Sequence, residues 1–396
     1  MSLRDYFILS APPTRDVDAS FGTAREAAVD PQDLRIEEAQ LTAAERSDQL
    51  RNPRVRAIAE PIPMALIAPV ESADDGTDLE TDDPAVSTTW GVEAVGATTS
   101  PFDGSGITVA VLDTGIDPFH PAFAGIHVVQ RNFTEEGDDD TNGHGTHCAG
   151  TIFGQDVDGL RIGVARNIDK ALIGKVLGQG GGTSATIARA IQWAFGEGAN
   201  VISMSLGIDF PGLVDRWVTR GLDPRPATSR ALEQYRNNIN MFSALAELIK
   251  QQSLFGQGCI LVAASGNESR RPDFEIAVAP PAAAEDILAI GALGNGPNGL
   301  EIADFSNTQV DIAAPGVRVL SAEAGSSGLV SLNGTSMATP HVAGVAALWA
   351  QKQQELNGAV NVGALKAQLV GNAITTPLAP NVERDDVGQG IVQAPQ

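Results

Sequence analysis

The segment from Asn333 to Gly344, Asn-Gly-Thr-Ser-Met-Ala-Thr-Pro-His-Val-Ala-Gly, constrains this chain most. A glycine-rich turn leads here directly into a long apolar helix, and Ser336 stands at the start of that helix. A seryl hydroxyl is a poor nucleophile at neutral pH, so a reactive Ser336 needs a histidine base, a carboxylate that orients it and donors for an oxyanion. The alternative is that Ser336 only caps the helix.

Candidates for the carboxylate and the base precede Ser336. The run from Ile107 to Asp113 predicts a buried parallel strand that ends in a tight turn, with Asp113 at its carboxyl end. Open α/β sheets keep their sites at that edge. The small residues of the segment 142–151 predict a helix start that packs close to this strand, and His144 is the first histidine in it.

The order Asp113, His144, Ser336 and the motif around each residue resemble the subtilisin-like serine proteases, the subtilase family. Ser203-Met204-Ser205-Leu206-Gly207 resembles the substrate-binding strand of that family, and Ala263-Ala264-Ser265-Gly266-Asn267 its oxyanion segment. The resemblance covers about residues 88 to 394, and four motifs in one order carry far more weight than any one alone.

The resemblance implies a role for each of these residues. Ser336 attacks the scissile carbonyl, His144 takes its proton, and Asp113 fixes the imidazole tautomer. The Asn267 amide and the Ser336 backbone N–H stabilise the oxyanion. A peptide substrate pairs as an extended strand with edges of the enzyme. The implied substrate-binding residues are Ser205, Leu206, Gly207, Gly180, Gly181, Ala264, Ser265 and Gly266.

Other interpretations are consistent with parts of the sequence. Asp113 alone is equally consistent with a turn aspartate, and His147 and His341 with hydrogen-bonded histidines packed on helices. Lipases and esterases carry Gly-x-Ser-x-Gly, whereas Ala338 ends this pentad, and their order would need an essential histidine after Ser336. A catalytically silent peptide-binding protein, with its cleft filled by residues 61–70, is the rival from another class. A maturation protease with one protein substrate is a third alternative.

Composition limits the partners. The chain has 396 residues and a formal net charge of −23, which argues against nucleic acid and anionic membrane surfaces. No apolar run is long enough to span a membrane. We expect a monomer that acts on a protein or peptide substrate and needs no cofactor for its chemistry.

Acidic segments suit a structural calcium ion, which subtilases often bind. The resemblance places the best candidates at Asp156 and Asp158, after the helix that begins near His144. A second acidic cluster lies at 135–140. Calcium needs six to eight oxygens, so a solvated surface is the alternative for both. Cys148 and Cys259 are expected to be buried and reduced.

The N-terminal part is expected to be a separate unit. Residues 1–70 resemble an inhibitor-type prodomain, with strands at 6–9 and 55–60, a helix capped by Thr42, and a tail from Pro61 to Val70 that lies in the cleft as an inhibitor. A plain accessory domain is the alternative. Met1 to Ser10 lacks a secretory signal, so we expect a cytoplasmic protein, or a secreted one if a signal preceded this sequence.

The rest of the chain divides into a linker and a larger domain. Residues 71–87 hold seven acidic residues and no basic one, as in a solvated linker that includes a processing region. Residues 88–396 are expected to be a doubly wound α/β domain with a mostly parallel sheet. An insert at about 208–257 is predicted to form a surface loop followed by a helix over 228–252. The whole is interpreted as a serine endopeptidase made as a self-processing zymogen.

Overall fold

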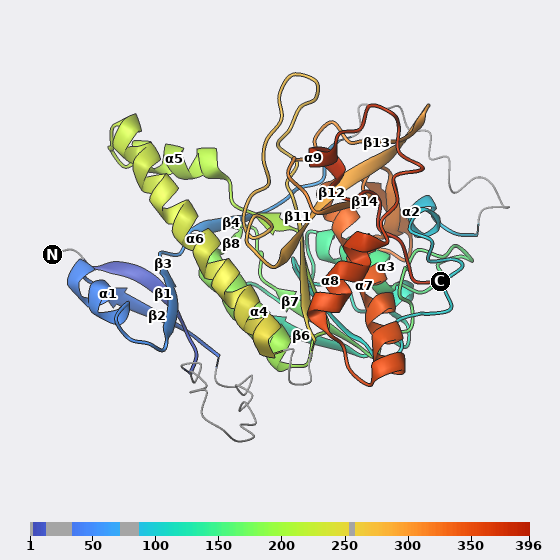
Figure 1. The fold of residues 1–396 in the computed structure, drawn as a ribbon, viewed down its shortest axis with the longest axis horizontal. Coiled ribbons are helices and arrows are strands. Elements are labelled where there is room, and N and C mark those ends of the chain that lie inside the picture. Colours follow the sequence, from blue (N-terminus) through green and yellow to red (C-terminus); the bar gives the residue numbers. More distant parts are fainter. Residues whose placement is uncertain (1–2, 13–33, 72–86, 253–257) are drawn as a thin grey trace, which may run out of the picture.

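The computed structural model describes residues 3–12, 34–71, 87–252 and 258–396. Its centre is an eight-stranded sheet with the strand order β13-β12-β11-β9-β5-β7-β6, and β14 pairs with β12 (Figure 1). All pairs in this sheet are parallel except β12 with β13. The strands are β5 (Thr108–Asp113), β6 (Val128–Asn132), β7 (Lys170–Lys175), β9 (Val201–Met204), β11 (Ile260–Ala264), β12 (Ile287–Gly296), β13 (Gly299–Ile302) and β14 (Ile312–Pro315).

Helices cover both faces of the sheet, as expected for a doubly wound α/β fold. Strand β5 is buried along its whole length, and its side chains alternate between two cores. Val109 and Val111 face the core of α3 (His144–Phe153) and α7 (Thr335–Asn357). Ala110 and Leu112 face that of α4 (Ser184–Gly196) and α6 (Pro224–Gln252). The fold class predicted from the sequence is confirmed.

The fold also contains smaller elements. They are α2 (Trp90–Ala94), the 3₁₀ helix η2 (Pro121–Phe123), α8 (Val362–Gly371), α9 (Arg384–Val387) and the hairpin of β15 (Val319–Ala322) and β16 (Leu329–Leu332). Within the described residues, none of the helices combines the length and apolar character needed to cross a bilayer.

The N-terminal segment forms a sheet of its own, in the order β2-β1-β3. It contains β1 (Arg4–Ser10), β2 (Arg35–Leu41), α1 (Ala43–Gln49) and β3 (Val55–Ala59), so both predicted strands and the Thr42-capped helix are confirmed. Thr42 and Glu45 form a reciprocal capping box. Phe7 and Leu9 join the core that includes α6, so this sheet packs on the helix, as Figure 1 shows at the left.

The chain next runs into the body of the molecule as an extended tail. Strand β4 (Pro63–Leu66) lies between β10 (Leu206–Gly207) and β8 (Gly182–Thr183) and is antiparallel to both. Most of the predicted acidic linker, residues 72–86, lies outside the described residues.

The insert differs from the expectation. The sequence predicted a surface loop before residue 228, but α5 (Phe210–Thr219) occupies that stretch and α6 already begins at Pro224. The side chain of Asp209 accepts a hydrogen bond from the Gly212 N–H and so caps α5. Trp217 donates to Gln234 and ties the two helices together. The loop prediction was wrong because these contacts between helices have no counterpart in the local pattern.

Candidate active site

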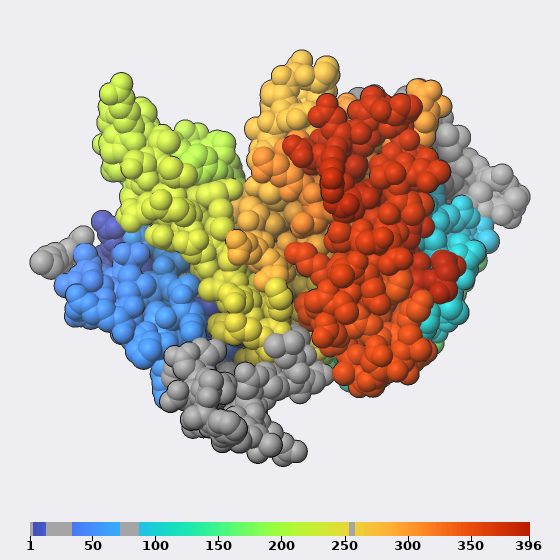
Figure 2. Space-filling view, in the orientation of Figure 1, coloured from blue at the N-terminus to red at the C-terminus, as the bar shows by residue number. Residues whose placement is uncertain are grey.

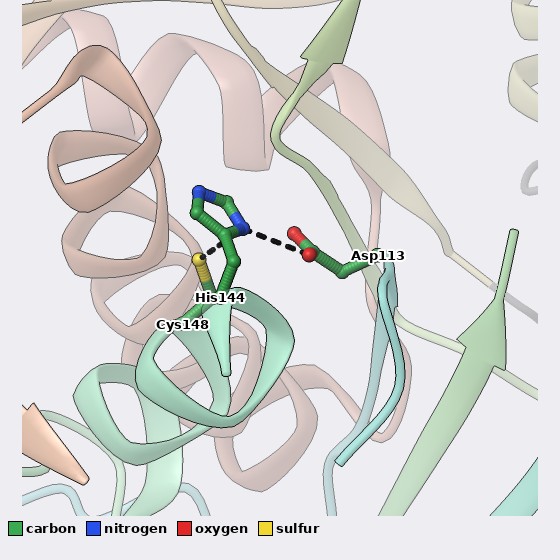
Figure 3. A group of neighbouring side chains, drawn as sticks. All are labelled: Asp113, His144 and Cys148. Carbon is green, nitrogen blue, oxygen red and sulfur yellow. Dashed lines mark hydrogen bonds and ion pairs between the residues drawn. The ribbon is translucent and has the colours of Figure 1, made fainter. Parts of the chain in front are cut away.

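Asp113 and His144 meet where β5 ends and α3 begins (Figure 3). The Nδ1 atom of His144 lies 2.8 Å from Oδ1 of Asp113, which also accepts the backbone N–H of Thr114 at 2.7 Å. Both side chains are almost fully buried. The helix can come this close because residue 145 is glycine: a Cβ there would lie 2.2 Å from the Gly115 carbonyl oxygen.

This contact sets the protonation of the imidazole. Nδ1 donates to the carboxylate, which leaves Nε2 as the nitrogen that can accept a proton. Nε2 is buried and has no hydrogen-bond partner among the described residues. Burial lowers the pKa of His144, but the Asp113 charge and the Cys148 thiol outweigh burial and raise the pKa well above its usual value.

Ser336 is the second residue of α7, and its backbone is held from outside the helix. Pro340 lies one turn further on and has no N–H, so it cannot bond to the Ser336 carbonyl. The Cys148 thiol, 3.4 Å away, and the Ser205 hydroxyl, 3.3 Å away, donate to this oxygen instead. These two contacts fix the start of α7 against α3 and the strand end at Ser205.

The tail from Pro63 to Val70 occupies the cleft beside Ser336. The Ser336 hydroxyl donates to the carbonyl oxygen of Ile67 at 2.9 Å, and the Ile67 N–H donates to the Ser205 carbonyl at 3.4 Å. One residue on, the Asn267 amide donates to the Ala68 carbonyl at 2.9 Å. Val70 exchanges hydrogen bonds with Asn333. The tail therefore crosses the whole site as a bound peptide would.

The Asn267 amide is oriented by the residue before the serine. Both the backbone N–H and the hydroxyl of Thr335 donate to Oδ1 of Asn267 at 2.9 Å, which turns the Nδ2 donor towards the tail. Sequence reasoning missed Thr335 and Asn333 as site residues. Their adjacency to Ser336 was the available signal.

The structure places the predicted substrate-binding residues in two groups. The first group lies at the tail. Leu206 and Gly207 pair with β4, and the Ser205 carbonyl accepts the Ile67 N–H. Gly181 also lies there, and a Cβ at this position would be 2.6 Å from the Met64 carbonyl oxygen. Gly180 lines an adjacent cavity of about 530 Å³.

The second group lies at the end of β11. Ala264 is the last residue of that strand. The hydroxyl and the carbonyl of Ser265 bond to Asn307, and the Gly266 N–H donates to Thr335. These residues support the position of Asn267.

His147 and His341 are hydrogen-bonded histidines packed on helices, as predicted. Nε2 of His147 contacts the Val319 carbonyl at 2.9 Å, and Nδ1 of His341 contacts that of Met337 at 2.9 Å. Burial lowers the pKa of His147 to about 3 and that of His341 to about 4, so both are neutral. Cys148 and Cys259 are buried thiols.

Of the two candidate calcium ligands, Asp156 is paired with an arginine, and a calcium ion at Asp156 and Asp158 stays a prediction. Asp156 pairs with Arg166 at 2.7 Å, and a guanidinium beside this carboxylate opposes a second cation. In the second acidic cluster, Asp140 is buried and accepts hydrogen bonds from Thr114 and Thr146. In the parts of the chain described, the cluster of His, Cys and carboxylate side chains close enough to share a metal ion consists of Asp113, His144 and Cys148.

Residues 104–391 match the model of the Subtilase family. The alkaline protease of Alkalihalobacillus alcalophilus is 37% identical over 282 residues, which cover 69% of this chain and 63% of the relative. Subtilisin Savinase of Lederbergia lenta is 37% identical over 68% of this chain and 86% of its own length.

A third relative is described by its name as intracellular. The intracellular serine protease of Paenibacillus polymyxa is 32% identical over 73% of this chain and 79% of its own length. The match therefore spans less than two thirds of the alkaline protease but most of the other two relatives.

Proposed function

Because this chain belongs to the subtilase family, we propose that it is a serine endopeptidase that hydrolyses peptide bonds through an acyl-enzyme on Ser336. The observation that carries the proposal is the peptide tail held between Ser336, Ser205 and Asn267 beside the buried Asp113–His144 pair. A substrate peptide would take the path of this tail. The proposed reaction uses no cofactor.

In the first step, Nε2 of His144 removes the hydroxyl proton of Ser336 while Oγ attacks the substrate carbonyl carbon. Asp113 keeps Nδ1 protonated and stabilises the imidazolium that forms. His144 then protonates the leaving amine, and water releases the acyl group by the reverse proton movements. Because the pKa of His144 is raised, the neutral base is favoured at alkaline pH.

The oxyanion would be stabilised by two donors. Nδ2 of Asn267 is already directed into the cleft, and Thr335 holds it there. The Ser336 N–H lies at the N-terminus of α7, where the helix dipole also favours negative charge. In the intact chain Nδ2 of Asn267 donates to the Ala68 carbonyl, so it would have to turn to the Ile67 carbonyl for cleavage after Ile67.

We also propose that the protein is made as a zymogen with residues 1–70 as its inhibitor. The contacts of the tail favour cleavage of the Ile67–Ala68 bond, since Ile67 meets both Ser205 and Ser336. This junction precedes the acidic linker in which the sequence placed the processing region. The next bond, Ala68–Pro69, is less suited because its leaving group is a proline nitrogen.

The silent peptide-binding protein is the rival, and one observation favours it. Ile67 engages the Ser336 hydroxyl and Ala68 engages the Asn267 amide, so the chain's own tail saturates both groups. The two functions differ in the reactivity of Ser336.

A fluorophosphonate probe tests the proposed activity. We expect covalent labelling that maps to Ser336, together with hydrolysis of peptides, and loss of both in a Ser336→Ala variant. A His144→Ala variant should label at least 100-fold more slowly, since base catalysis contributes about 10²–10⁴. Ser336 that stays unlabelled after the tail has been removed would favour the silent binding protein.

A further inference from the structure

The strongest unexplained feature is a carboxylate site on the insert, where Glu60 is bound. Arg230 of α6 donates to both carboxylate oxygens of Glu60 at 2.5 Å, and the Gln234 amide donates to one of them at 2.8 Å. The Asn238 amide donates to the Glu60 backbone carbonyl at 3.0 Å. Arg230, Gln234 and Asn238 are four residues apart in turn, so they share one face of α6.

The insert holds these donors in place. Trp217 of α5 donates to the Gln234 side-chain oxygen at 2.8 Å, which turns the amide nitrogen of Gln234 towards Glu60. The guanidinium of Arg230 lies over the Trp217 ring, 5.5 Å from its centre, and its other nitrogen pairs with Glu233 at 3.1 Å. In Figure 2, α5 and the first part of α6 project from the body at the upper left. The contacts that orient Arg230 and Gln234 therefore lie within the insert.

In the intact chain, with the N-terminal segment in place, the site is largely buried. The side chains of Arg230 and Glu60 are 16% and 13% exposed, and Asn238 is fully buried. Arg4 adds a weaker contact from the N-terminal sheet at 3.3 Å. The side-chain oxygen of Asn238 is also buried and has no partner in the part of the chain that is described, so the site keeps an acceptor that Glu60 does not use. One guanidinium nitrogen, Nη2, meets both oxygens of Glu60, and this charge-assisted contact together with the Gln234 amide favours a carboxylate.

Glu60 is connected to the active site by the tail itself. It lies seven residues before Ile67, and the chain between them runs through β4 into the cleft. In a substrate peptide that follows the same path, one residue takes the place of Ile67 and pairs with Ser205. The residue seven positions before it would then reach Arg230. Strands β8 and β10 do not contact a residue at that position, because they pair only with Pro63 to Leu66.

We propose that Arg230, Gln234 and Asn238 form an exosite for an acidic side chain. In the intact chain it holds Glu60 and so keeps the tail in the cleft. After the N-terminal segment has left, it binds a glutamate of the substrate, seven residues before the residue that pairs with Ser205. This inference rests on the proposed protease function, because a substrate reaches the exosite only after the tail has left.

Two fluorogenic peptides test the exosite. Both have the sequence of residues 58–71 with Ala in place of Pro69, and one has Glu and the other Gln at the position of Glu60. On the processed enzyme we expect kcat/KM to be about tenfold higher for the Glu peptide, which corresponds to about 1.4 kcal/mol. Arg230→Gln should reduce the ratio to about one. Arg236→Gln removes an exposed arginine of the same helix and should leave the ratio unchanged. Equal rates in the wild type, or a preference that survives Arg230→Gln, would overturn the exosite.

A second measurement keeps the two proposals apart. If the enzyme cleaves neither peptide, the protease proposal has failed, and the carboxylate site is then tested in the full chain carrying Ser336→Ala. There, Glu60→Gln and Arg230→Gln should each speed amide hydrogen exchange at Ile67 and Val70 about tenfold, and the double variant should add little more. Unchanged exchange in both single variants would overturn the site even if the protein is not a protease.

Discussion

Each polar side chain at the centre of the cleft is positioned by a residue distant in sequence. Asp113 orients His144, Thr335 orients Asn267, and the Ser336 backbone is held by Cys148 and Ser205. Pro340 makes the last of these contacts necessary, because it leaves the Ser336 carbonyl without a helical donor. The geometry around the serine is therefore set by the packing of α3, α7 and the end of β9 rather than by the local turn.

The Asn267 donor is the residue whose contribution can be isolated most cleanly. Asn267→Asp keeps the oxygen that accepts from Thr335 but removes the N–H donor. We expect turnover of a peptide substrate to fall by about 10²–10³, the loss found when the equivalent donor of subtilisin is removed. Circular dichroism should show the same fold as the wild type. Undiminished turnover would remove Asn267 from the reaction.

The sequence predicted most of the polar residues in the cleft, but it did not predict the residues that orient them. Asp113, His144, Ser336 and Asn267 lie in short motifs, and the structure brings them around one tail. Thr335 was missed although it precedes Ser336, since its partner Asn267 is 68 residues away. No local pattern gives the direction of a hydrogen bond between distant segments.

At the scale of elements, long apolar segments were predicted well and the insert was not. Strand β5 and helix α7 have continuous buried patterns, and their types follow from them. Helix α5 is short and buries only Leu213, so its pattern resembles that of a surface loop. Its stability comes from the Asp209 cap and from packing on α6, and neither can be deduced before the fold is known.

Helix α3 carries a histidine whose burial makes stability depend on pH. Burial lowers the pKa of His147 to about 3, below its unfolded value of about 6.5. The depressed pKa adds stability that is complete above the unfolded value and is lost as the pH falls from 6.5 towards 3. The loss is about 1.4 kcal/mol per pH unit.

Urea unfolding in a Ser336→Ala background checks this value without self-digestion. When the pH is lowered from 6.5 to 5, the unfolding free energy of the protein with His147 should fall by about 2 kcal/mol more than that of a His147→Gln variant. The glutamine amide can still donate to the Val319 carbonyl. If the free energies of the two proteins fall in parallel with pH, His147 is not held neutral by the fold.

At the scale of the whole molecule, one apolar core joins the N-terminal sheet to the α/β body. Phe7 and Leu9 share that core with Phe242 and Leu245 of α6, and the tail continues the chain into the cleft. The sequence indicated two parts and a tail, because an inhibitor-type segment was expected before an acidic linker. The sequence could not give the docking surface on α6, since it depends on Glu60 meeting three side chains of the insert.

The measurement that tests the central claim most directly is the intact mass of the purified chain over time, beside the Ser336→Ala variant. We expect only the wild type to lose an N-terminal piece, and the mass of that piece should place the cut after Ile67. Cleavage of both proteins at the same rate would assign the cut to another protease. If both stay whole and Ser336 in the wild type does not react with a fluorophosphonate even after the tail has been displaced, the claim that Ser336 is the nucleophile of a self-processing protease is contradicted.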